Sequence, residues 1–386
     1  MAIRLIELFR SKTGRLLRSM LVSATMNDRV REYLHARRTF LKVALAAGVS
    51  ALGGNAVAGT RTEQIKYWDN HAGFGYAGPR DVDLLERWRA AGVNYLSINV
   101  GYDPVPWSTT IRAIADYTSG IEARSDMVLC STLSQVLAAW QAGQMALTFD
   151  IEGMGSLNGD VSMVKLYYRL GVRQMLIAYN LNNDAGGGCH DQDKGLTDFG
   201  RAVVSEMNRV GMVVDCAHSG IKSGLEAMKL SNKPCIFSHA NARALYDHER
   251  NITDEQIKAV AATGGVVGVN GLSLFLGDGA PTVASIVAHI NYIAKLVGTE
   301  HVGIGLDYDP TAGGLGPTAG PGPDEATSAK YWPARQYPAS IKDVFLPPSI
   351  LPQVGEQLRS LGYKESSIQA IMSDNFMRVA SQVWAR

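Results

Sequence analysis

Short apolar runs alternate with longer amphipathic segments along the chain from residue 65 onward. Eight of the apolar runs predict strands, at residues 65–69, 95–100, 145–151, 173–178, 212–216, 235–238, 265–270 and 302–306. Most of these runs are continuously apolar, which is typical of parallel strands that are buried on both faces. The segments between them have a helical periodicity and predict helices at residues 82–91, 133–142, 162–170, 198–210, 254–262 and 282–297.

Capping residues support several of the predicted helices. The residues that precede a helix in this way are Asp81, Thr132, Thr197 and Thr253. Gln256 stands three residues after Thr253, as a capping box requires. Strand–helix alternation repeated eight times predicts a closed, TIM-like (β/α)₈ barrel of the α/β class. A doubly wound open sheet is the alternative, but no glycine fingerprint follows the first predicted strand.

A segment of different composition follows the last predicted strand. Residues 308–345 are rich in Gly, Pro, Thr and Ala and indicate a long loop. Loops of this length in compact domains are functional lids or binding loops, or else they are disordered. Two further helices, at about residues 349–361 and 365–385, are expected to cap the barrel. We therefore predict a single barrel domain over residues 59–386, preceded by a separate N-terminal region over residues 1–58.

The N-terminal region has the pattern of an export signal. Arg37 and Arg38 precede a short apolar run at residues 43–52, and Ala56-Val57-Ala58 forms a small-residue cleavage pattern. The paired arginines point to the twin-arginine export machinery, which carries folded proteins. The apolar run is too short to span a bilayer. We expect a periplasmic or extracellular protein; an ordinary basic amphipathic start is the alternative, with Met26 as an alternative first residue.

Composition narrows the range of partners. The 37 basic and 36 acidic residues leave a net charge of +1, which argues against a nucleic acid or an anionic membrane as the partner. The chain has 386 residues, 46% of them hydrophobic, enough for one large core. Its four cysteines form no close-spaced metal motif. Cys216 and Cys235 lie inside apolar runs, so we interpret them as buried thiols rather than a disulfide.

Side chains that can bind a metal stand at the carboxyl ends of five predicted strands: His71, Glu152, His218, His239 and Asp307. The carboxyl ends of the strands carry the chemistry in a (β/α)₈ barrel. A single histidine at a strand end is more often a structural residue, but five such side chains at one end favour a metal site. Imidazole and carboxylate ligands together suit zinc or a similar cation.

Two aspartates lie inside the same apolar strands. Asp150 and Asp215 cannot be buried without a partner. They either orient a ligand histidine from behind or pair with a lysine or arginine. The sequence does not separate these two interpretations.

Three stretches resemble the membrane (renal-type) dipeptidase family, and the likeness covers most of residues 65–385. Residues 195–219 contain GLTDFG followed by EMNRVGMVVDCAHS, residues 237–254 contain FSHA followed by RNITD, and residues 301–309 read HVGIGLDYD. Asn375, Phe376 and Arg378 are similar to the family's closing helix. The resemblance implies a binuclear zinc site in an amidohydrolase-like barrel that hydrolyses dipeptides.

The resemblance also implies a role for each metal-binding side chain. Glu152 would bridge two zinc ions, His218 and His239 would complete the second ion, and His71 would belong to the first. The family has His-x-Asp on its first strand, whereas this chain has His71-Ala72-Gly73. Asp69 lies two residues in the other direction on the same strand face and is a candidate substitute.

Three more residues acquire roles from the same resemblance. Arg250 would bind the substrate carboxylate through a bidentate pair. Asp307 would carry a proton from the metal-bound water to the leaving amine. Tyr179 stands where the family has a histidine that donates to the substrate carbonyl oxygen, and a phenol can also donate a hydrogen bond.

We therefore interpret the chain as a metallo-dipeptidase that hydrolyses dipeptides or a related small amide with metal-activated water and one or two zinc ions. One alternative is a hydrolase of another amide, a lactam or an ester. Another is a catalytically impaired binding protein on the same barrel. The expected partner is a small dipeptide-like substrate, and a homodimeric state is left open.

Overall fold

The computed structural model describes residues 65–73, 81–277, 280–311, 324–338 and 344–385. The predicted export signal lies outside the described residues. Among them, no helix combines the length and the apolar character that crossing a membrane requires. The four cysteines are all described and are free thiols, with Cys216 and Cys235 buried as expected.

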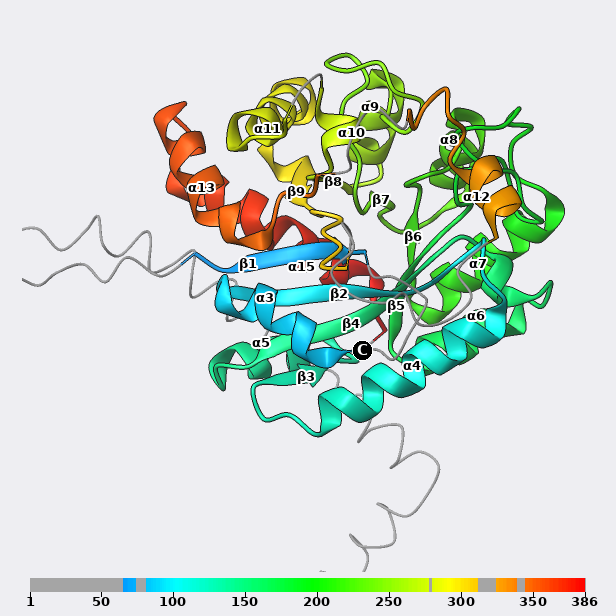
Figure 1. Cartoon of the computed structure of the whole chain (residues 1–386), viewed down its shortest axis with the longest axis horizontal. Coiled ribbons are helices and arrows are strands. Elements are labelled where there is room, and N and C mark those ends of the chain that lie inside the picture. Colours follow the sequence, from blue (N-terminus) through cyan, green and yellow to red (C-terminus); the bar gives the residue numbers. More distant parts are fainter. Residues whose placement is uncertain (1–64, 74–80, 278–279, 312–323, 339–343, 386) are drawn as a thin grey trace, which may run out of the picture. The chain divides into compact units, whose positions relative to one another are not determined.

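Eight parallel strands close into the predicted barrel (Figure 1). β2 pairs with both β1 and β4, and β9 pairs with β1, so the ring has no free edge. Around the ring the strands are β1 (Tyr67–Ala72), β2 (Val93–Tyr102), β4 (Met145–Glu152), β5 (Val172–Leu176), β6 (Val213–Asp215), β7 (Ile236–Phe237), β8 (Val266–Val269) and β9 (Val302–Ile304). Each overlaps one predicted strand, which confirms the (β/α)₈ fold and excludes the open sheet.

A ninth strand, β3 (Met127–Leu129), was not predicted. It runs parallel to the first residues of β4, from Met145 to Leu147, while β5 pairs with β4 further along. β3 therefore lies beside the amino-terminal half of the barrel without entering the ring. Three residues are too few to show a periodicity in the sequence.

The predicted helices are present and cover the outside of the strands (Figure 1). They are η1 (Val82–Leu85) with α3 (Glu86–Ala90), α5 (Leu133–Gln141), α6 (Ser162–Arg169), α7 (Asp198–Val210), α9 (Asp254–Ala262) and α11 (Val283–Val297). Within the part of the chain that the structure describes, the α-helices missed between the predicted strands are α4 (Trp107–Glu122), α8 (Ile221–Leu230) and the short α10 (Ser273–Leu276), and a further one, in the predicted loop, is described below. The buried face of α4 includes Thr110 and Ala113, which weaken its apolar periodicity.

The predicted caps are formed by side-chain contacts. Asp81, Thr132, Thr197 and Thr253 each accept a backbone N–H from the first turn of the following helix. Gln256 completes the capping box at Thr253, and Gln135 completes a second one at Thr132. These contacts satisfy N–H groups that have no partner inside the helix.

The C-terminal helices close the amino-terminal end of the barrel. They are η4 (Pro348–Ile350), α13 (Leu351–Ser360), α14 (Glu365–Gln369), the π-helical turn η5 (Ala370–Asp374) and α15 (Asn375–Val383). Asn375 donates to the backbone carbonyls of Thr299 and Val302 at the start of β9. Phe376 packs in one buried cluster with Trp68 and Val266, from the early parts of β1 and β8. The turn η5 and α15 therefore form a plug opposite the carboxyl ends of the strands, whereas α13 packs against α11.

The segment predicted as a long loop contains a helix. α12 (Glu325–Tyr331) begins at Asp324, whose side chain accepts the Thr327 N–H. Residues 312–323 and 339–343 lie outside the described part of the chain. The backbone carbonyl of Tyr331 accepts a hydrogen bond of 2.9 Å from Asn180 Nδ2, which fixes the end of α12 beside the loop after β5.

The contact between Phe376 and β9 generates a testable prediction. A Cβ added at Gly303 would lie 2.3 Å from Phe376 Cε2 and 3.0 Å from Val266 Cγ1. Gly303→Ala is expected to lower the free energy of unfolding by about 1–3 kcal/mol, since overpacking a filled core costs this much. Denaturation in urea, followed by circular dichroism, measures the change.

Gly224→Ala in α8 is the matched control, because the atom nearest to its added Cβ is 3.7 Å away. This change should leave stability unaltered or raise it by about 0.4–1 kcal/mol. Equal effects of the two substitutions would contradict the packing of Phe376 against β9.

Candidate metal centre

The five predicted metal-binding side chains converge at the carboxyl end of the barrel. His71 lies in β1 and Glu152 ends β4, whereas His218, His239 and Asp307 follow β6, β7 and β9. The first four are buried, and the side chain of Asp307 is 18% exposed.

The backbone at this end adopts uncommon conformations. His218, Asp307 and Asn180 have φ angles of 58°, 56° and 59°, in the left-handed region that side-chain-bearing residues rarely occupy. The Asp307 N–H donates to the His71 carbonyl at 3.1 Å, and the Cys189 N–H donates to the His218 carbonyl at 2.9 Å. Such conformations cost free energy and persist where neighbouring contacts hold them, commonly at functional sites.

Glu152, His218 and His239 form a compact triangle of donor atoms. Glu152 Oε1 lies 3.2 Å from Nε2 of each histidine, and the two Nε2 atoms are 2.9 Å apart. Ligand atoms around one tetrahedral zinc ion, with bonds of about 2.0–2.1 Å, are separated by about 3.3 Å. The triangle therefore fits a zinc ion with little rearrangement.

The outer nitrogens of these two histidines are held from behind. His218 Nδ1 lies 2.6 Å from Asn180 Oδ1, and His239 Nδ1 lies 2.7 Å from Ser238 Oγ. Because an amide oxygen only accepts, His218 carries its proton on Nδ1 and turns the Nε2 lone pair toward the triangle. Burial and the positive charges of Arg250 and His71 hold the pKa of both histidines well below the ordinary value. Both imidazoles are thus neutral, as metal ligands must be.

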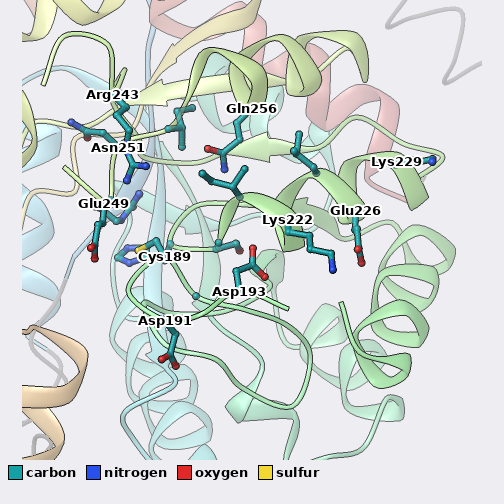
Figure 2. A pocket seen from close by; sticks show the side chains of 18 residues that line it. Cys189, Asp191, Asp193, Lys222, Glu226, Lys229, Arg243, Glu249, Asn251 and Gln256 are labelled. Atoms are coloured by element: carbon teal, nitrogen blue, oxygen red, sulfur yellow. The ribbon is translucent and has the colours of Figure 1, made fainter. Parts of the chain in front are cut away.

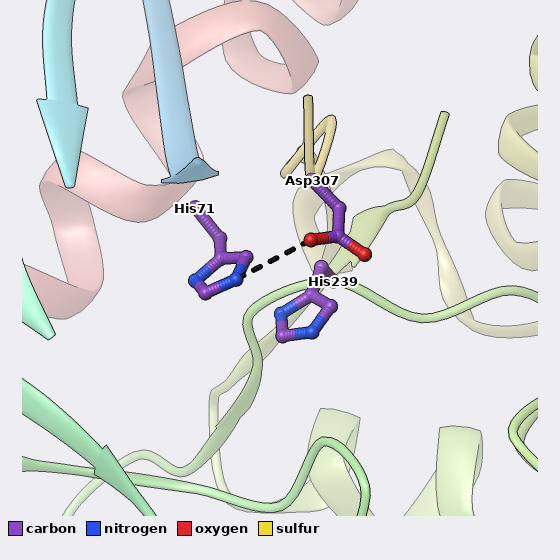
Figure 3. Close-up of side chains that lie close together, drawn as sticks. All are labelled: His71, His239 and Asp307. Atoms are coloured by element: carbon purple, nitrogen blue, oxygen red, sulfur yellow. Dashed lines mark ion pairs between the residues drawn. The ribbon is translucent and has the colours of Figure 1, made fainter. Parts of the chain in front are cut away.

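His71 occupies the other side of Glu152 and stacks on His239, with ring centroids 3.9 Å apart. Its Nδ1 lies 3.1 Å from Asp150 Oδ1. Its Nε2 has no hydrogen-bond partner in the described part of the chain. It lies 3.6 Å from Glu152 Oε1 and faces Asp307 Oδ1 at 3.5 Å (Figure 3). Burial lowers the pKa of His71, but Asp150 and Glu152 outweigh burial and raise it overall.

The two aspartates that the sequence left ambiguous have different roles. Asp150 fixes the ring of His71 and is itself held by Ser97 Oγ at 2.6 Å and Asn99 Nδ2 at 3.0 Å. Asp215 touches no ligand ring. Its Oδ1 accepts backbone N–H groups of Ala217 and Ser238, both at 3.0 Å, and these residues directly precede His218 and His239. One aspartate thus orients a side chain and the other orients two backbone turns.

Tyr179 lies against the triangle within an aromatic cluster. Its ring stacks on His218 at 4.2 Å and meets the ring of Tyr102 edge-on at 5.2 Å, with Trp332 at 5.8 Å. Its backbone N–H donates to Asp103 Oδ2 at 3.0 Å, and burial raises the pKa of Asp103 to about 6. Trp332 directly follows α12, so the segment predicted as a loop forms part of the wall beside the metal centre.

Arg250 is a buried cation beside the centre. It is 2% exposed, and its Nη2 donates to the His239 carbonyl at 2.7 Å. Its Nε and Nη1 atoms have no hydrogen-bond partner among the described residues. A buried guanidinium with unused donors is typical of a site that binds an anion.

Arg250 and His218 both line a cavity of about 520 Å³. Most of the remaining wall comes from α8 and from the loops at residues 188–193 and 249–252, together with Arg243 and Gln256 (Figure 2). It includes the apolar side chains of Ile221 and Leu225. The metal centre therefore adjoins a space large enough for part of a small substrate.

A protein-family model described as membrane dipeptidase (Peptidase family M19) matches residues 107–317, more than half of the chain. The chain belongs to the membrane dipeptidase family. An uncharacterized dipeptidase of Schizosaccharomyces pombe is 32% identical over 194 residues, which cover 48% of this chain and 47% of that protein. The chain thus spans about half the length of this curated relative.

Solved structures of other proteins have the same barrel fold as this chain. An amidohydrolase from Pseudomonas aeruginosa has a TM-score of 0.74 at 27% identity, covering 83% of this chain and 97% of that one. A metallo peptidase from Rhodobacter sphaeroides, solved with a phosphinate mimic of the dipeptide L-Ala-D-Ala, has a TM-score of 0.66 at 21% identity, covering 83% and 99%. At 21% identity, this second similarity is evidence for the fold alone.

Asp69 does not replace the aspartate that the family resemblance leads us to expect at the position of Gly73. Its Oδ2 accepts the Trp88 indole N–H at 2.9 Å, and its Oδ1 accepts the Leu306 N–H at 2.8 Å. These contacts hold the start of β1 against its neighbours, one pleat away from His71. The hypothesis that Asp69 is a substitute ligand is therefore wrong, and the corner at Gly73 lacks a carboxylate of its own strand.

Three residues of the site were missed in the sequence: Asn180, Asn270 and Asp103. Asn270 Nδ2 donates to Asp307 Oδ2 at 2.9 Å. Asn270 ends the predicted strand at residues 265–270, so the rule that identified the ligands could also have found it. Asn180 offers a weaker signal, because asparagine tolerates a left-handed backbone. Asp103 lies three residues beyond the predicted strand at residues 95–100, and its partners come from distant loops.

Proposed function

We propose that the chain is a zinc-dependent dipeptidase that hydrolyses a dipeptide or a closely related small amide. One juxtaposition carries the proposal: the donor triangle of Glu152, His218 and His239 lies beside a buried Arg250 whose Nε and Nη1 have no partner in the described residues. A cation site next to an anion site matches the scissile carbonyl and the free carboxylate of a dipeptide. Membership of the membrane dipeptidase family supports the same activity.

Glu152, His218 and His239 would hold the zinc ion. A bound zinc ion lowers the pKa of a water molecule toward 7 and polarises a carbonyl oxygen. The chain supplies two neutral imidazoles whose outer nitrogens are fixed by Asn180 and Ser238. It also supplies a buried carboxylate between them, so the ligands are oriented in advance.

Arg250 would bind the carboxylate of the substrate. Its Nη2 is fixed on the His239 carbonyl, next to a triangle ligand, so its two unused nitrogens are held at a constant place relative to the metal centre. A carboxylate that pairs with them removes the cost of the buried charge. The cavity beside Arg250 would then receive the C-terminal residue of the substrate.

Asp307 would move the proton. Asn270 holds its Oδ2 at 2.9 Å, while its Oδ1 faces the centre at 3.5 Å from His71 Nε2. A carboxylate held in this way can take a proton from the attacking water and give it to the leaving amine. Its partial exposure leaves room for the amine to depart.

The first test measures metal-dependent turnover. Chain stripped with a chelator should hydrolyse no dipeptide, and addition of Zn²⁺ should restore hydrolysis of a panel that includes L-Ala-D-Ala, the dipeptide mimicked in the Rhodobacter sphaeroides structure. Glu152→Gln should lower kcat/KM by at least about 10³-fold, because a metal ligand is lost. An amine-detecting assay measures the rate, with exposed Glu255→Gln on α9 as the control.

The same assay tests whether the substrate needs a free C-terminal carboxylate. The C-terminal amide of the best dipeptide should react at least about 100-fold more slowly, and Arg250→Met should reduce this discrimination to near unity. Absence of turnover on every dipeptide at full zinc occupancy would refute the proposal. It would favour the catalytically impaired binding protein.

Tyr179 supports a more specific proposal, namely that its phenol donates to the substrate carbonyl oxygen. Tyr179→Phe should then lower kcat by about 10²-fold with little change in KM, as loss of one oxyanion donor does. Tyr102→Phe is the matched control, since the Tyr102 ring belongs to the same aromatic cluster. Steady-state kinetics at saturating zinc measure both variants.

An unchanged kcat in Tyr179→Phe would show that the phenol only packs on His218. If dipeptides then react poorly while a lactam or ester reacts well, the activity belongs to that neighbouring class.

We further propose that the chain is exported by the twin-arginine route to the periplasm or the extracellular space. The support is the order of Arg37-Arg38, an apolar run and Ala56-Val57-Ala58. In a bacterial host with this machinery, the double change Arg37→Lys and Arg38→Lys should leave the chain uncleaved in the cytoplasm. Cell fractionation and immunoblotting measure this, with the double change Arg29→Lys and Arg31→Lys as the charge-matched control. Export of both variants alike would refute the route.

A further inference from the structure

We propose that Asp307 serves as the carboxylate ligand of a second, weaker cation position, which it forms together with His71 and Glu152. The proposal deepens the zinc-dependent function proposed above and rests on it only for the identity of the cation. It assigns to Asp307 a role in addition to proton transfer.

The state of the His71 ring is the first support. Asp150 lies 3.1 Å from Nδ1 and is itself held by Ser97 and Asn99, so the ring cannot turn freely. His71 is fully buried, and its Nε2 has no hydrogen-bond partner in the part of the chain that the structure describes. A histidine fixed by a carboxylate on one nitrogen, with the other nitrogen buried and unpartnered, has the arrangement of a metal ligand.

The second support is the distance of the two nearest carboxylates from that nitrogen. His71 Nε2 lies 3.5 Å from Asp307 Oδ1 (Figure 3) and 3.6 Å from Glu152 Oε1. Both separations are too long for a good hydrogen bond and close to the separation of about 3.3 Å between ligands of one tetrahedral zinc ion. The ligand atoms of His71, His239 and Asp307 all lie within 4.8 Å of one another, so the Asp307 carboxylate lies beside the triangle ligand His239 as well as beside His71.

Gly73 explains why Asp307 can take this place. A Cβ at Gly73 would point at the Asp307 carboxylate, 3.3 Å from its Oδ1, and would lie 3.5 Å from Asp309 Cβ. A larger residue at position 73 would therefore crowd the carboxylate that faces His71. Because residue 73 is a glycine, it offers no carboxylate to this corner. Asp307, which follows β9, is an acidic side chain that faces His71.

The second position should bind more weakly than the triangle. The triangle combines two neutral imidazoles with Glu152 Oε1, whereas the second position has one imidazole and shares the same Oε1 with the triangle. Asp307 is also tied to Asn270 through Oδ2 and is partly exposed. Fewer dedicated ligands lower the affinity for a cation, and we expect a difference of at least about tenfold.

The test is a titration of the chelator-stripped full chain with Co²⁺ and Zn²⁺. The visible absorption of Co²⁺ reports ligand geometry, and competition with a chromophoric chelator gives each Kd. The wild type should bind one equivalent tightly and a second at least about tenfold more weakly. Asp307→Asn should abolish the weak class and leave the tight class unchanged. Gly73→Asp should tighten the weak class by at least about tenfold, because it supplies a dedicated carboxylate.

Two matched controls separate ligation from other effects. Gly73→Ala adds the Cβ without a carboxylate. Asp309→Asn removes the charge of a neighbouring side chain, whose Oδ1 accepts hydrogen bonds from the N–H and the hydroxyl of Thr311. Neither control should tighten the weak class, and Asp309→Asn should leave it unchanged. In every variant, retention of the tight class shows that the barrel is folded.

The proposal is overturned if the wild type binds a single equivalent, if Asp307→Asn keeps both classes, or if Gly73→Ala tightens the weak class as much as Gly73→Asp does. The titration measures no turnover. A chain that binds two cations as described but hydrolyses no dipeptide refutes the dipeptidase activity alone. An active chain with one cation refutes only the second position.

Discussion

The centre of the molecule depends on one buried carboxylate. Glu152 Oε1 lies 3.2 Å from the Nε2 atoms of His218 and His239 and 3.6 Å from that of His71. Burial raises the pKa of Glu152 to about 8, with Asp307 and Asp150 acting in the same direction and His71 against it. A cation that binds at Glu152 therefore competes with a proton for this carboxylate.

The residues around the metal centre orient its ligands and do not themselves offer atoms to the metal. Asn180 and Ser238 fix two imidazole rings, Asp150 fixes the third, and Asp215 fixes the backbone before His218 and His239. The left-handed turns at His218 and Asp307 are costly for residues with side chains. A barrel without a free edge, plugged at its other end by α15, supplies the rigidity that keeps these turns in place.

The sequence predicted the barrel and the five converging side chains for one reason. In a parallel barrel the carboxyl ends of all strands lie at the same rim. The position of a polar residue at the end of an apolar run can therefore be predicted without knowledge of how the side chains pack. Asn270 obeys this rule and was overlooked. The rule does not reach Asp103, Trp332 or β3, whose places depend on contacts between distant segments or on three residues alone. It also could not separate Asp150 from Asp215, since both are buried aspartates on strands and only their partners differ.

The resemblance in sequence implies two departures from the family pattern, at Gly73 and at Tyr179. The triangle of Glu152, His218 and His239 is complete, and Arg250 beside it keeps its unused donors. Changes affect the corner at Gly73 and the wall at Tyr179. At the corner, one carboxylate, Asp307, faces two demands, because an oxygen that binds a cation is no longer available to take a proton. The tight position can therefore act without the weak one, whereas filling the weak one engages the group that the proposed reaction needs.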